Sequence, residues 1–386
     1  MADGHGRNEE LRRPRLGLVG LGLIAQVAHL PTLRLQADRW DVVALCDLSE
    51  SALELAGEYF PDAKRTREWR DVLELDLDAV MVLTPGSHAP IAVAAARRGL
   101  HVFVEKPMCF SAEEGREMLA AAGGAGVVLM VGYTKRYDPA YERLHEEVRE
   151  WGEPVRLVRV TTLEAPWTPY VAHHRRARGG DVPADVLAAL AADDERRISD
   201  AIGTEDPVIR RAYRFWLLDS MVHELNAVRG LLGEPTEVRF ADVWGDAAGV
   251  TATLAFGDST ECVLMWVDLP HLTRYELEIA LYAADRRAFL TFPSPYLRNA
   301  PTELALEGGT PGEVSSWRTE HVVGYEEAFE RELLEFHAAI VAGRAPRTPG
   351  TDAIHDVALC QAIVRARIER RPVANPTALD DGRVRV

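Results

Sequence analysis

A glycine-rich turn follows the first apolar run of the chain, and it constrains the fold more than any other feature of the sequence. Residues 15–19 lead into the pattern Gly20-x-Gly22-x-x-Ala25, after which a helical pattern begins. In a strand-to-helix turn of this type, the first glycine allows the tight turn, the second lets the backbone approach a pyrophosphate, and a small third residue lets helix and strand pack closely. Backbone N–H groups at the helix start, at Leu23 and Ile24, would hold the phosphates. Glycine-rich turns between a strand and a helix also occur for close packing alone, so the surrounding sequence must show whether this turn binds a dinucleotide.

Short apolar runs alternate with helical patterns through residues 14–135. The runs are RLGLVG, DVVALCD, LDAVMVLT, HVFVE and VVLMVG, and segments such as SESALELAGEYF and APIAVAAARRG separate them. Runs that are apolar throughout indicate strands buried on both faces of a parallel sheet, with right-handed helical crossovers covering them. We therefore predict an N-terminal Rossmann domain with a doubly wound parallel sheet.

The pattern changes in residues 136–386, which we predict to form a second, α/β domain. Strands of antiparallel type, such as TEVRFADVW and ECVLMWVDL, are joined by turn residues, and two amphipathic helices close the chain. One face of this mostly antiparallel sheet would pack on helices. Because strands this apolar are a liability when open, the other face would be covered in a homo-oligomer.

Asp47 closes the second apolar run, 25 residues after Gly22. A carboxylate at about this place bonds the adenosine ribose hydroxyls of a dinucleotide. It also repels a 2′-phosphate, and no Arg or Lys follows immediately, so NAD is favoured over NADP as the cofactor. The alternative is that Asp47 only caps the next helix, a role that Ser49 could fill equally well.

Three residues further along the chain carry candidate chemistry. Lys106 follows the fifth apolar run, at the sheet edge where ligands bind, and Pro107 restricts its backbone to extended geometry. Asp219 and His223 stand at i and i+4, on one face of a predicted helix. Alternatively, Lys106 is a solvated surface charge, Asp219 caps the N-terminus of the helix, and His223 is a core histidine whose hydrogen bonds are all made within the protein.

The motifs VGLGLIA, TPGSHAPIAVAAARRGLHVFVEKPM, VGYTKRYDPAY and LLDSMVHELNAVRGLLGEP occur in that order. In this combination the chain resembles the Gfo/Idh/MocA oxidoreductase family over about residues 15–373. The resemblance implies a Rossmann domain followed by a C-terminal domain with an open-faced sheet, assembled as a homodimer or homotetramer. The active site would lie between the domains, at the nicotinamide.

The resemblance also implies roles for single residues. His223 would be the general acid/base on a substrate hydroxyl, Asp219 would orient the reacting group, and Lys106 would stabilise charge developing on oxygen, which suits hydride transfer from a carbinol carbon. Thr84 or Arg136 could instead be structural. The residues implied near the cofactor are Gly20, Gly22, Leu23, Ile24, Asp47, Thr84, Pro85, His88, Glu105, Lys106 and Arg136.

The sequence departs from the family pattern in three places. Gly86 replaces the usual Asn after Thr-Pro, bulky residues 214–218 replace a glycine-rich run, and residues 166–211 are longer than the family needs. We predict that Trp167 and Trp216 shape the substrate pocket. One hypothesis makes the insertion a lid whose Arg175 and Arg176 hold an anionic group of the substrate; the alternative is a solvated basic turn or subunit contact.

These features predict an NAD-dependent oxidoreductase acting on a secondary alcohol or ketone carbon of a sugar-like, cyclitol or glycoside substrate. A second interpretation is a tightly held NAD that oxidises the substrate transiently during elimination or hydrolysis. A third is a cofactor-binding sensor without catalysis, against which the intact Lys106, Asp219 and His223 argue. An imine reductase is a further alternative.

Composition restricts the partners and the compartment. A formal charge of −16 opposes nucleic-acid binding. The four cysteines form no CxxC pair, so we expect neither zinc nor disulfides, and a zinc site at His173, His174 and His223 lacks ligand spacing. The N-terminus lacks a signal-peptide core, and no run reaches the about 18 apolar residues of a membrane span. We therefore expect a cytoplasmic protein without membrane contact, with residues 1–13 as a loose tail.

Overall fold

The first sheet of the computed structural model is parallel throughout and has the order β3-β2-β1-β4-β5-β6. The structure describes residues 13–310, 312–370 and 373–374, so nearly all of the predicted tail lies outside the described residues. Strands β1, β4 and β6 are almost wholly buried, as expected of a sheet covered on both faces. The strands are β1 (Arg15–Val19), β2 (Asp41–Cys46), β3 (Lys64–Thr66), β4 (Ala79–Val82), β5 (His101–Glu105) and β6 (Leu129–Gly132).

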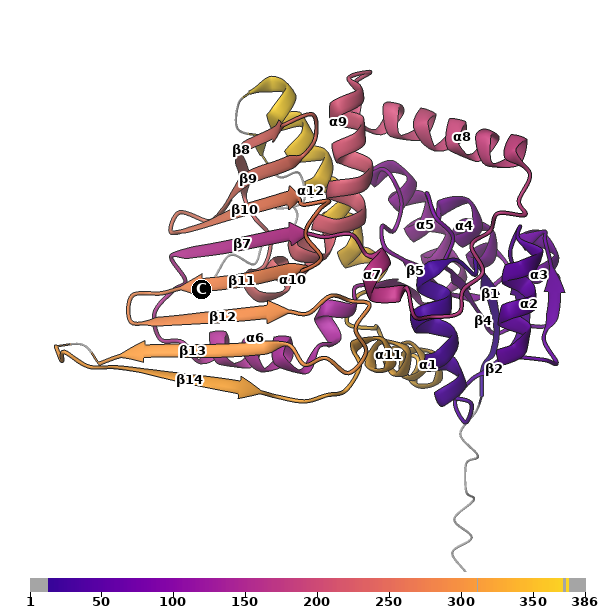
Figure 1. The fold of residues 1–386 in the computed structure, drawn as a ribbon, viewed down its shortest axis with the longest axis horizontal. Helices are drawn as coiled ribbons and strands as arrows, with labels where there is room; N and C mark the ends of the chain where they lie inside the picture. Colours follow the sequence, from indigo (N-terminus) through magenta and orange to yellow (C-terminus); the bar gives the residue numbers. More distant parts are fainter. Residues whose placement is uncertain (1–12, 311, 371–372, 375–386) are drawn as a thin grey trace, which may run out of the picture.

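Helices on both faces of this sheet confirm the predicted doubly wound fold (Figure 1). The strand order reverses between β1 and β4, and the carboxyl ends of strands at such a switch point form the ligand-binding edge. The helices are η1 (Ala25–His29), α1 (Leu30–Leu35), α2 (Glu50–Tyr59), α3 (Trp69–Leu73), α4 (Ala89–Arg97) and α5 (Ala112–Ala125).

The second sheet is mostly antiparallel, and among its described strands β7 and β10 form the parallel pair. Its order is β14-β13-β12-β11-β7-β10-β9-β8-β15. On β10, Cys262, Leu264 and Trp266 are fully buried, whereas Met265 between them is 37% exposed. This alternation confirms a sheet with one covered and one open face. The strands are β7 (Leu157–Glu164), β8 (Glu237–Trp244), β9 (Gly249–Phe256), β10 (Thr260–Asp268), β11 (Glu276–Tyr282), β12 (Arg286–Phe292), β13 (Glu303–Gly309), β14 (Ser316–Val322) and β15 (Val373–Ala374).

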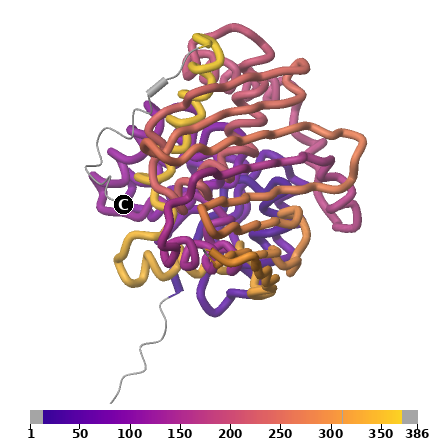
Figure 2. The backbone as a smooth tube through the Cα atoms, turned by 90° about the vertical axis from the view of Figure 1, so that its left-hand side faces the viewer, coloured from indigo at the N-terminus to yellow at the C-terminus, as the bar shows by residue number. Residues whose placement is uncertain are grey.

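Helices of the second half cover the inner face of this sheet and extend onto the Rossmann domain. Figure 2 shows the orange strands in front of the indigo N-terminal domain, so the two sheets follow one another along the long axis. No helix of the described ranges is both long and apolar enough to cross a membrane. The helices of the second half are η2 (Thr134–Tyr137), α6 (Pro139–Glu150), α7 (Thr168–Val171), α8 (Ala184–Ile202), α9 (Pro207–Arg211), η3 (Ala212–Met221), α10 (Val222–Leu232), α11 (Ala328–Ala342) and α12 (Gly350–Glu369); not all of them lie on the sheet.

The last two helices tie the two halves together. On α11, Phe336 stacks on Trp40 with ring centroids 5.6 Å apart, and Leu333 is fully buried in the same core. Ahead of α12, the hydroxyl of Thr348 donates to the carbonyl oxygen of Val131 at 2.7 Å. The expected division at residues 135/136 therefore separates the two sheets, but α11 and α12 pack on the N-terminal domain.

Candidate active site

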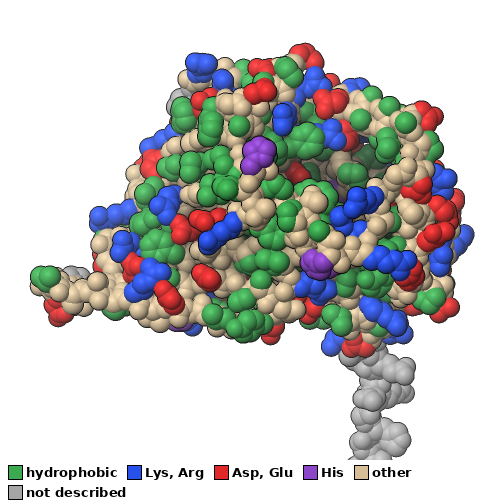
Figure 3. All heavy atoms as spheres, in the orientation of Figure 1, with side chains coloured by type: hydrophobic (Ala, Val, Ile, Leu, Met, Phe, Trp, Pro, Cys, Tyr) green, Lys and Arg blue, Asp and Glu red, His purple; other side chains and the backbone are tan. Residues whose placement is uncertain are grey.

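A cavity of about 720 Å³ lies between the domains, at the carboxyl ends of β4, β5 and β6. The face drawn in Figure 3 is hollowed below α8, toward the upper right of the view. Most of the site residues expected from the sequence line this one cavity. They are Gly22, Leu23, Ile24, Thr84, Pro85, Glu105, Lys106, Trp167, Trp216, Asp219 and His223.

The glycine turn has the geometry that a dinucleotide needs. Gly20 has φ +93°, and a Cβ there would lie 2.5 Å from the backbone nitrogen of Thr84, so only glycine fits. A Cβ on Gly22 would meet nothing within 4 Å, because its Cα faces open space in the cavity. Helical structure begins at Leu23, so its first N–H groups are available to phosphate oxygens. The turn therefore fits the cofactor implied by the resemblance.

Asp47 joins this turn to the second strand. Its carboxylate accepts hydrogen bonds from the backbone N–H groups of Leu21 at 2.6 Å and Ser49 at 2.8 Å. Ser49, and not Asp47, is the N-cap of α2, since its hydroxyl accepts from the N–H of Ala52. An ionised carboxylate has about four lone-pair sites, so Asp47 can still accept ribose hydroxyls. It lines a second cavity of about 400 Å³ together with Gly22.

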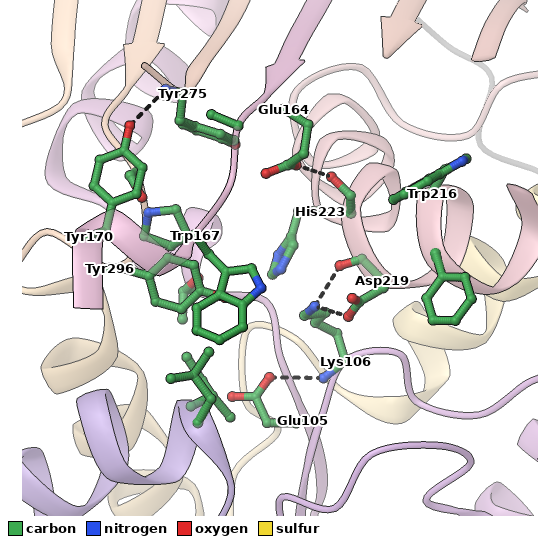
Figure 4. Close-up of a pocket in the computed structure, with 18 of the residues that line it drawn as sticks. Glu105, Lys106, Glu164, Trp167, Tyr170, Trp216, Asp219, His223, Tyr275 and Tyr296 are labelled. Carbon is green, nitrogen blue, oxygen red and sulfur yellow. Dashed lines mark hydrogen bonds and ion pairs between the residues drawn. The ribbon is translucent and has the colours of Figure 1, made fainter. Parts of the chain in front are cut away.

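Lys106, Asp219 and His223 meet in the first cavity (Figure 4). The Lys106 ammonium donates to the carboxylate of Asp219 at 2.7 Å and to its backbone carbonyl at 2.5 Å. The His223 ring lies beside this pair, and its Nδ1 is buried without a hydrogen-bond partner in the described part of the chain. A directed cation therefore stands next to an uncommitted imidazole.

The helix that carries Asp219 differs from the one predicted. Residues 212–221 form the π-helix η3, and α10 begins at Val222, so Asp219 and His223 straddle a junction between two helix types. π-Helical turns are rare and frequently occur at functional sites. Both side chains still line the same cavity, although the expected regular i, i+4 helix geometry is not found.

The pKa of Lys106 is raised and the pKa of His223 is lowered in this site. Burial would lower the pKa of Lys106, but the neighbouring Asp219 and Glu105 carboxylates outweigh it and raise the pKa above its usual value. Burial, with help from Lys135 and Lys106, lowers the pKa of His223 well below its ordinary range. At neutral pH the site therefore holds a charged ammonium and a neutral imidazole that can accept a proton.

Glu105 forms the floor below Lys106. One of its carboxylate oxygens lies 2.6 Å from Nε2 of the buried His29, and the other accepts the backbone N–H of Lys106 at 3.1 Å. Burial alone would raise the pKa of Glu105, but His29 and Lys106 more than compensate and lower it. Glu105 thus remains charged and fixes the start of the Lys106 segment.

A group of polar residues that the sequence analysis missed also lines the cavity. The ammonium of Lys135 lies 3.6 Å from the carboxylate of the buried Glu224, and burial shifts the pKa of each toward its neutral form. Glu164 accepts a hydrogen bond from the hydroxyl of Ser220 at 3.2 Å. Glu224 stands directly after His223 and Glu164 ends β7, so a search for acids at strand ends and beside the predicted histidine would have found both.

Aromatic side chains form the remaining walls. Trp216 stacks on Trp266 with ring centroids 4.2 Å apart, and its indole N–H donates to the carbonyl of Ala247 at 2.7 Å. Trp167 and Tyr296 lie next to each other in the cavity wall, with ring centroids 6.4 Å apart (Figure 4). Trp167 and Trp216 therefore line the cavity, as the sequence analysis expected, whereas Tyr170 of α7 and the loop residues Tyr275 and Tyr296 were not predicted.

Six expected site residues do not line the first cavity: Asp47 and Arg176 line the second one, and Gly20, His88, Arg136 and Arg175 line neither. His88 is buried, with its ring nitrogens 2.7 Å from the carbonyl oxygens of Thr84 and Pro107, so it positions the Thr84 segment from behind. Arg136 points toward Asn226 and Asp352, which is the structural alternative noted for it. Arg175 is exposed and paired with Glu58.

Gly86 lies against helix α8 of the insertion. Gly86 has φ +90°, and a Cβ there would approach the Asp194 carboxylate of α8 to 2.8 Å, so the insertion leaves no room for the usual Asn. Within the described ranges, no group of three or more His, Cys, Asp or Glu side chains could hold a metal ion.

Comparisons with known proteins agree with this geometry. A family model described as "Oxidoreductase family, NAD-binding Rossmann fold" matches residues 14–133. The inositol 2-dehydrogenase of Rhizobium meliloti is 26% identical over 375 residues, which cover 93% of this chain and 98% of that protein. A scyllo-inositol 2-dehydrogenase (NADP(+)) of Bacillus subtilis is 32% identical over 138 residues, 35% of this chain and 37% of its own.

The fold is also found among solved structures. Levoglucosan dehydrogenase in complex with NADH and levoglucosan matches with a TM-score of 0.72 and 18% identity, over 95% of this chain and 100% of that one. Because the sequence identity is only 18%, this similarity supports a shared fold and not a shared substrate. Both domains and their connection are therefore shared with solved proteins, and not the Rossmann domain alone.

Proposed function

Because this chain belongs to the Gfo/Idh/MocA family of oxidoreductases, we propose that it is an NAD-dependent dehydrogenase that acts on a secondary hydroxyl or ketone of a sugar, cyclitol or glycoside. The observation that supports this most directly is the meeting of Lys106, Asp219 and His223 beside the glycine turn. A catalytically silent sensor would need no proton-transfer group in that place.

His223 is the proposed proton acceptor. Bound NAD supplies the hydride-accepting ring, and the protein's own residues handle the proton of the substrate hydroxyl. Because burial and the nearby lysines lower the pKa of His223 well below its ordinary value, the imidazole is neutral at neutral pH and can take that proton without first losing one. In the reverse direction it returns the proton to the new alcohol.

Lys106 and Asp219 orient and stabilise the reacting oxygen. The Lys106 ammonium is fixed by Asp219 and can donate a further hydrogen bond to an alkoxide-like oxygen. A cation held in place before reaction needs little reorganisation as charge develops, and this is the usual source of strong electrostatic catalysis. Asp219 is 61% exposed at its side chain, so it can also accept a substrate hydroxyl.

The walls of the cavity fit a polyhydroxylated ring. Lys135, Glu164 and Glu224 offer hydrogen-bond donors and acceptors, and the aromatic faces of side chains such as Trp167 and Trp216 can pack against carbon-bound hydrogens. Inositol and other sugar dehydrogenases among the similar proteins support this substrate class. The stacked Trp216–Trp266 pair favours a substrate that carries a flat or apolar substituent.

The proposal is tested by titrating purified protein with NADH and NADPH by fluorescence, followed by a panel of inositols, keto-sugars and glycosides monitored at the nicotinamide absorbance band. We expect NADH to bind more tightly than NADPH and at least one polyol to be oxidised. Failure of both nucleotides to bind would refute the proposal.

Asp47 is expected to set the cofactor preference. Asp47→Asn keeps an acceptor for Leu21 or Ser49 but removes the charge that repels a 2′-phosphate. We expect NADH binding to weaken about 10-fold, the loss of one charged hydrogen bond, while NADPH binding stays equal or improves.

The matched control is Asp62→Asn, an exposed aspartate in the turn after α2. It should leave both dissociation constants unchanged. If Asp47→Asn also leaves the NADH/NADPH ratio unchanged, a different acid sets the preference.

A second candidate function is transient oxidation by a tightly held NAD. Residues 167–181 cover the cofactor half of the cleft and make hydrogen bonds to both η1 and α2, which favours slow exchange of the nucleotide. Product formation without accumulation of NADH would identify this chemistry, whereas equimolar NADH and product would identify a simple dehydrogenase.

A further inference from the structure

Residues 167–181, which we name the strap, cross from the second domain onto the N-terminal one. The backbone N–H and carbonyl of Ala177 form a reciprocal pair with the Gln26 amide, at 3.0 and 3.1 Å. The carboxylate of Asp181 accepts from the hydroxyl of Ser49 at 2.7 Å and from the backbone N–H of Ser51 at 3.0 Å. The strap is therefore attached to η1 and to the start of α2, the two helices that flank the dinucleotide turn.

The second cavity, of about 400 Å³, lies between the strap and this turn. Gly22 and Asp47 line one side, and residues 176–179 line the other. Trp167 borders both this cavity and the proposed catalytic one. Nucleotide bound along the turn would pass beneath the strap, with its adenosine ribose toward Asp47 and its phosphates toward Gly22.

Arg176 and Arg178 are the strap cations that line this cavity, and Arg176 is the more buried of the two. The guanidinium carbon of Arg176 lies 5.4 Å from the ring centre of Trp167, and among the described residues its buried Nε has no hydrogen-bond partner. Within the described part of the chain, no carboxylate lies within 4.0 Å of the Arg176 guanidinium. Its neighbour Arg175, by contrast, forms a bidentate ion pair with Glu58. The two adjacent arginines therefore differ: Arg175 is paired with Glu58 outside the cleft, whereas the charge of Arg176 inside the cleft is not paired with a described carboxylate.

An unpaired, partly buried guanidinium stacked on an indole needs an anion. Asp47 lines the same cavity, but in the described part of the chain it forms no ion pair with Arg176. The anion that the proposed function brings close to Gly22 is the pyrophosphate of the cofactor, which presents oxygens suited to a planar guanidinium.

We propose that Arg176 binds the cofactor pyrophosphate from the strap side, opposite the helix N-terminus, so that the nucleotide is enclosed between the two domains. This inference rests on the proposed function and adds a phosphate ligand contributed by the second domain. Release of the cofactor then requires breaking the Arg176 contact or displacing the strap at Ala177 and Asp181. Arg176 therefore acts on the cofactor and not on an anionic substrate.

The test compares Arg176→Met with Arg175→Met. Methionine retains an apolar stem that can pack on Trp167, and the two variants remove the same charge from adjacent positions of one strap. Dissociation constants and release rates of NADH and NADPH are measured by stopped-flow fluorescence without substrate, and those of ADP and adenosine by calorimetry. Thermal unfolding of both variants checks that they fold.

For Arg176→Met we expect NADH, NADPH and ADP to bind about 10- to 100-fold more weakly, the effect of losing charge-assisted hydrogen bonds. The increase should appear in the release rate, and adenosine, which lacks phosphates, should bind as before. Arg175→Met should change each constant less than about threefold, as surface ion pairs contribute little.

Equal behaviour of the two variants would overturn the inference, as would a loss confined to NADPH, which would place Arg176 at a 2′-phosphate instead. These outcomes are distinct from failure of the proposed function, because in that case the unmodified protein would itself bind neither NADH nor NADPH.

Discussion

Replacing His223 with asparagine is expected to lower turnover by about 10²–10⁴-fold while NADH binding persists, the effect of losing a positioned general base. Asparagine retains a polar side chain of similar reach but cannot take the hydroxyl proton. Because His223 lies beside Lys106 and Asp219 and away from the second cavity, the cofactor should still bind. Initial rates with the best polyol of the panel and NADH titrations provide the two readouts.

His321→Asn is the control for this experiment, since His321 lies on β14 at the far edge of the second sheet. It should retain full activity. A His223→Asn protein that turns over at the normal rate would show that another group takes the proton.

Lys106→Met is expected to reduce turnover by about 10²–10³-fold, the usual cost of removing one preorganised donor from a developing oxyanion. It should also move the acidic limb of the pH–rate profile. After burial, the charges of Lys135 and Lys106 lower the pKa of His223; removing one of them raises that pKa. His223 then becomes protonated, and inactive as a base, at a higher pH than in the natural protein.

The control is Lys64→Met, which removes the same charge from exposed strand β3. Profiles of the oxidation rate between pH 5 and 9 would be recorded for all three proteins. If the Lys106→Met limb coincides with that of Lys64→Met, the ammonium does not act on His223.

The N-terminal domain was predictable because its signals are local. Each buried parallel strand is a continuous apolar run, and Gly20 and Gly22 occupy the positions that the turn geometry demands. The HVFVE run ends at Lys106, and placing a lysine at the carboxyl end of a buried strand is enough to place it at the ligand-binding edge.

The active site was predicted less completely, because the direction of a side chain depends on local helix geometry. Lys135 and Arg136 are adjacent on the 3₁₀ helix η2, so their side chains point to different sides, and it is Lys135 that reaches the cavity. The sequence analysis chose Arg136 from the resemblance. Periodicity likewise could not reveal the π-helix that carries Asp219.

The insertion shows a further limit of sequence reasoning. Its arginines suggested a substrate lid, but the destination of each guanidinium depends on partners far away in the chain. Glu58 on α2 pairs with Arg175, and Gln26 on η1 holds the backbone beside Arg176. Contacts over more than a hundred residues of sequence have no local signature, so only the folded chain distinguishes the two arginines.

The position of α11 has a consequence for biosynthesis. Leu333 and Phe336 complete a core whose other members, such as Trp40 and Leu30, are translated roughly three hundred residues earlier. All six strands of the nucleotide-binding sheet therefore emerge from the ribosome before α11, the helix that completes the core on one of the faces of the sheet. Domains usually fold in the order in which they are made, but here the first domain must wait for the last part of the chain. We expect chaperones to be needed during that interval, and nonsense mutations that remove only the last sixty residues to destroy both domains together.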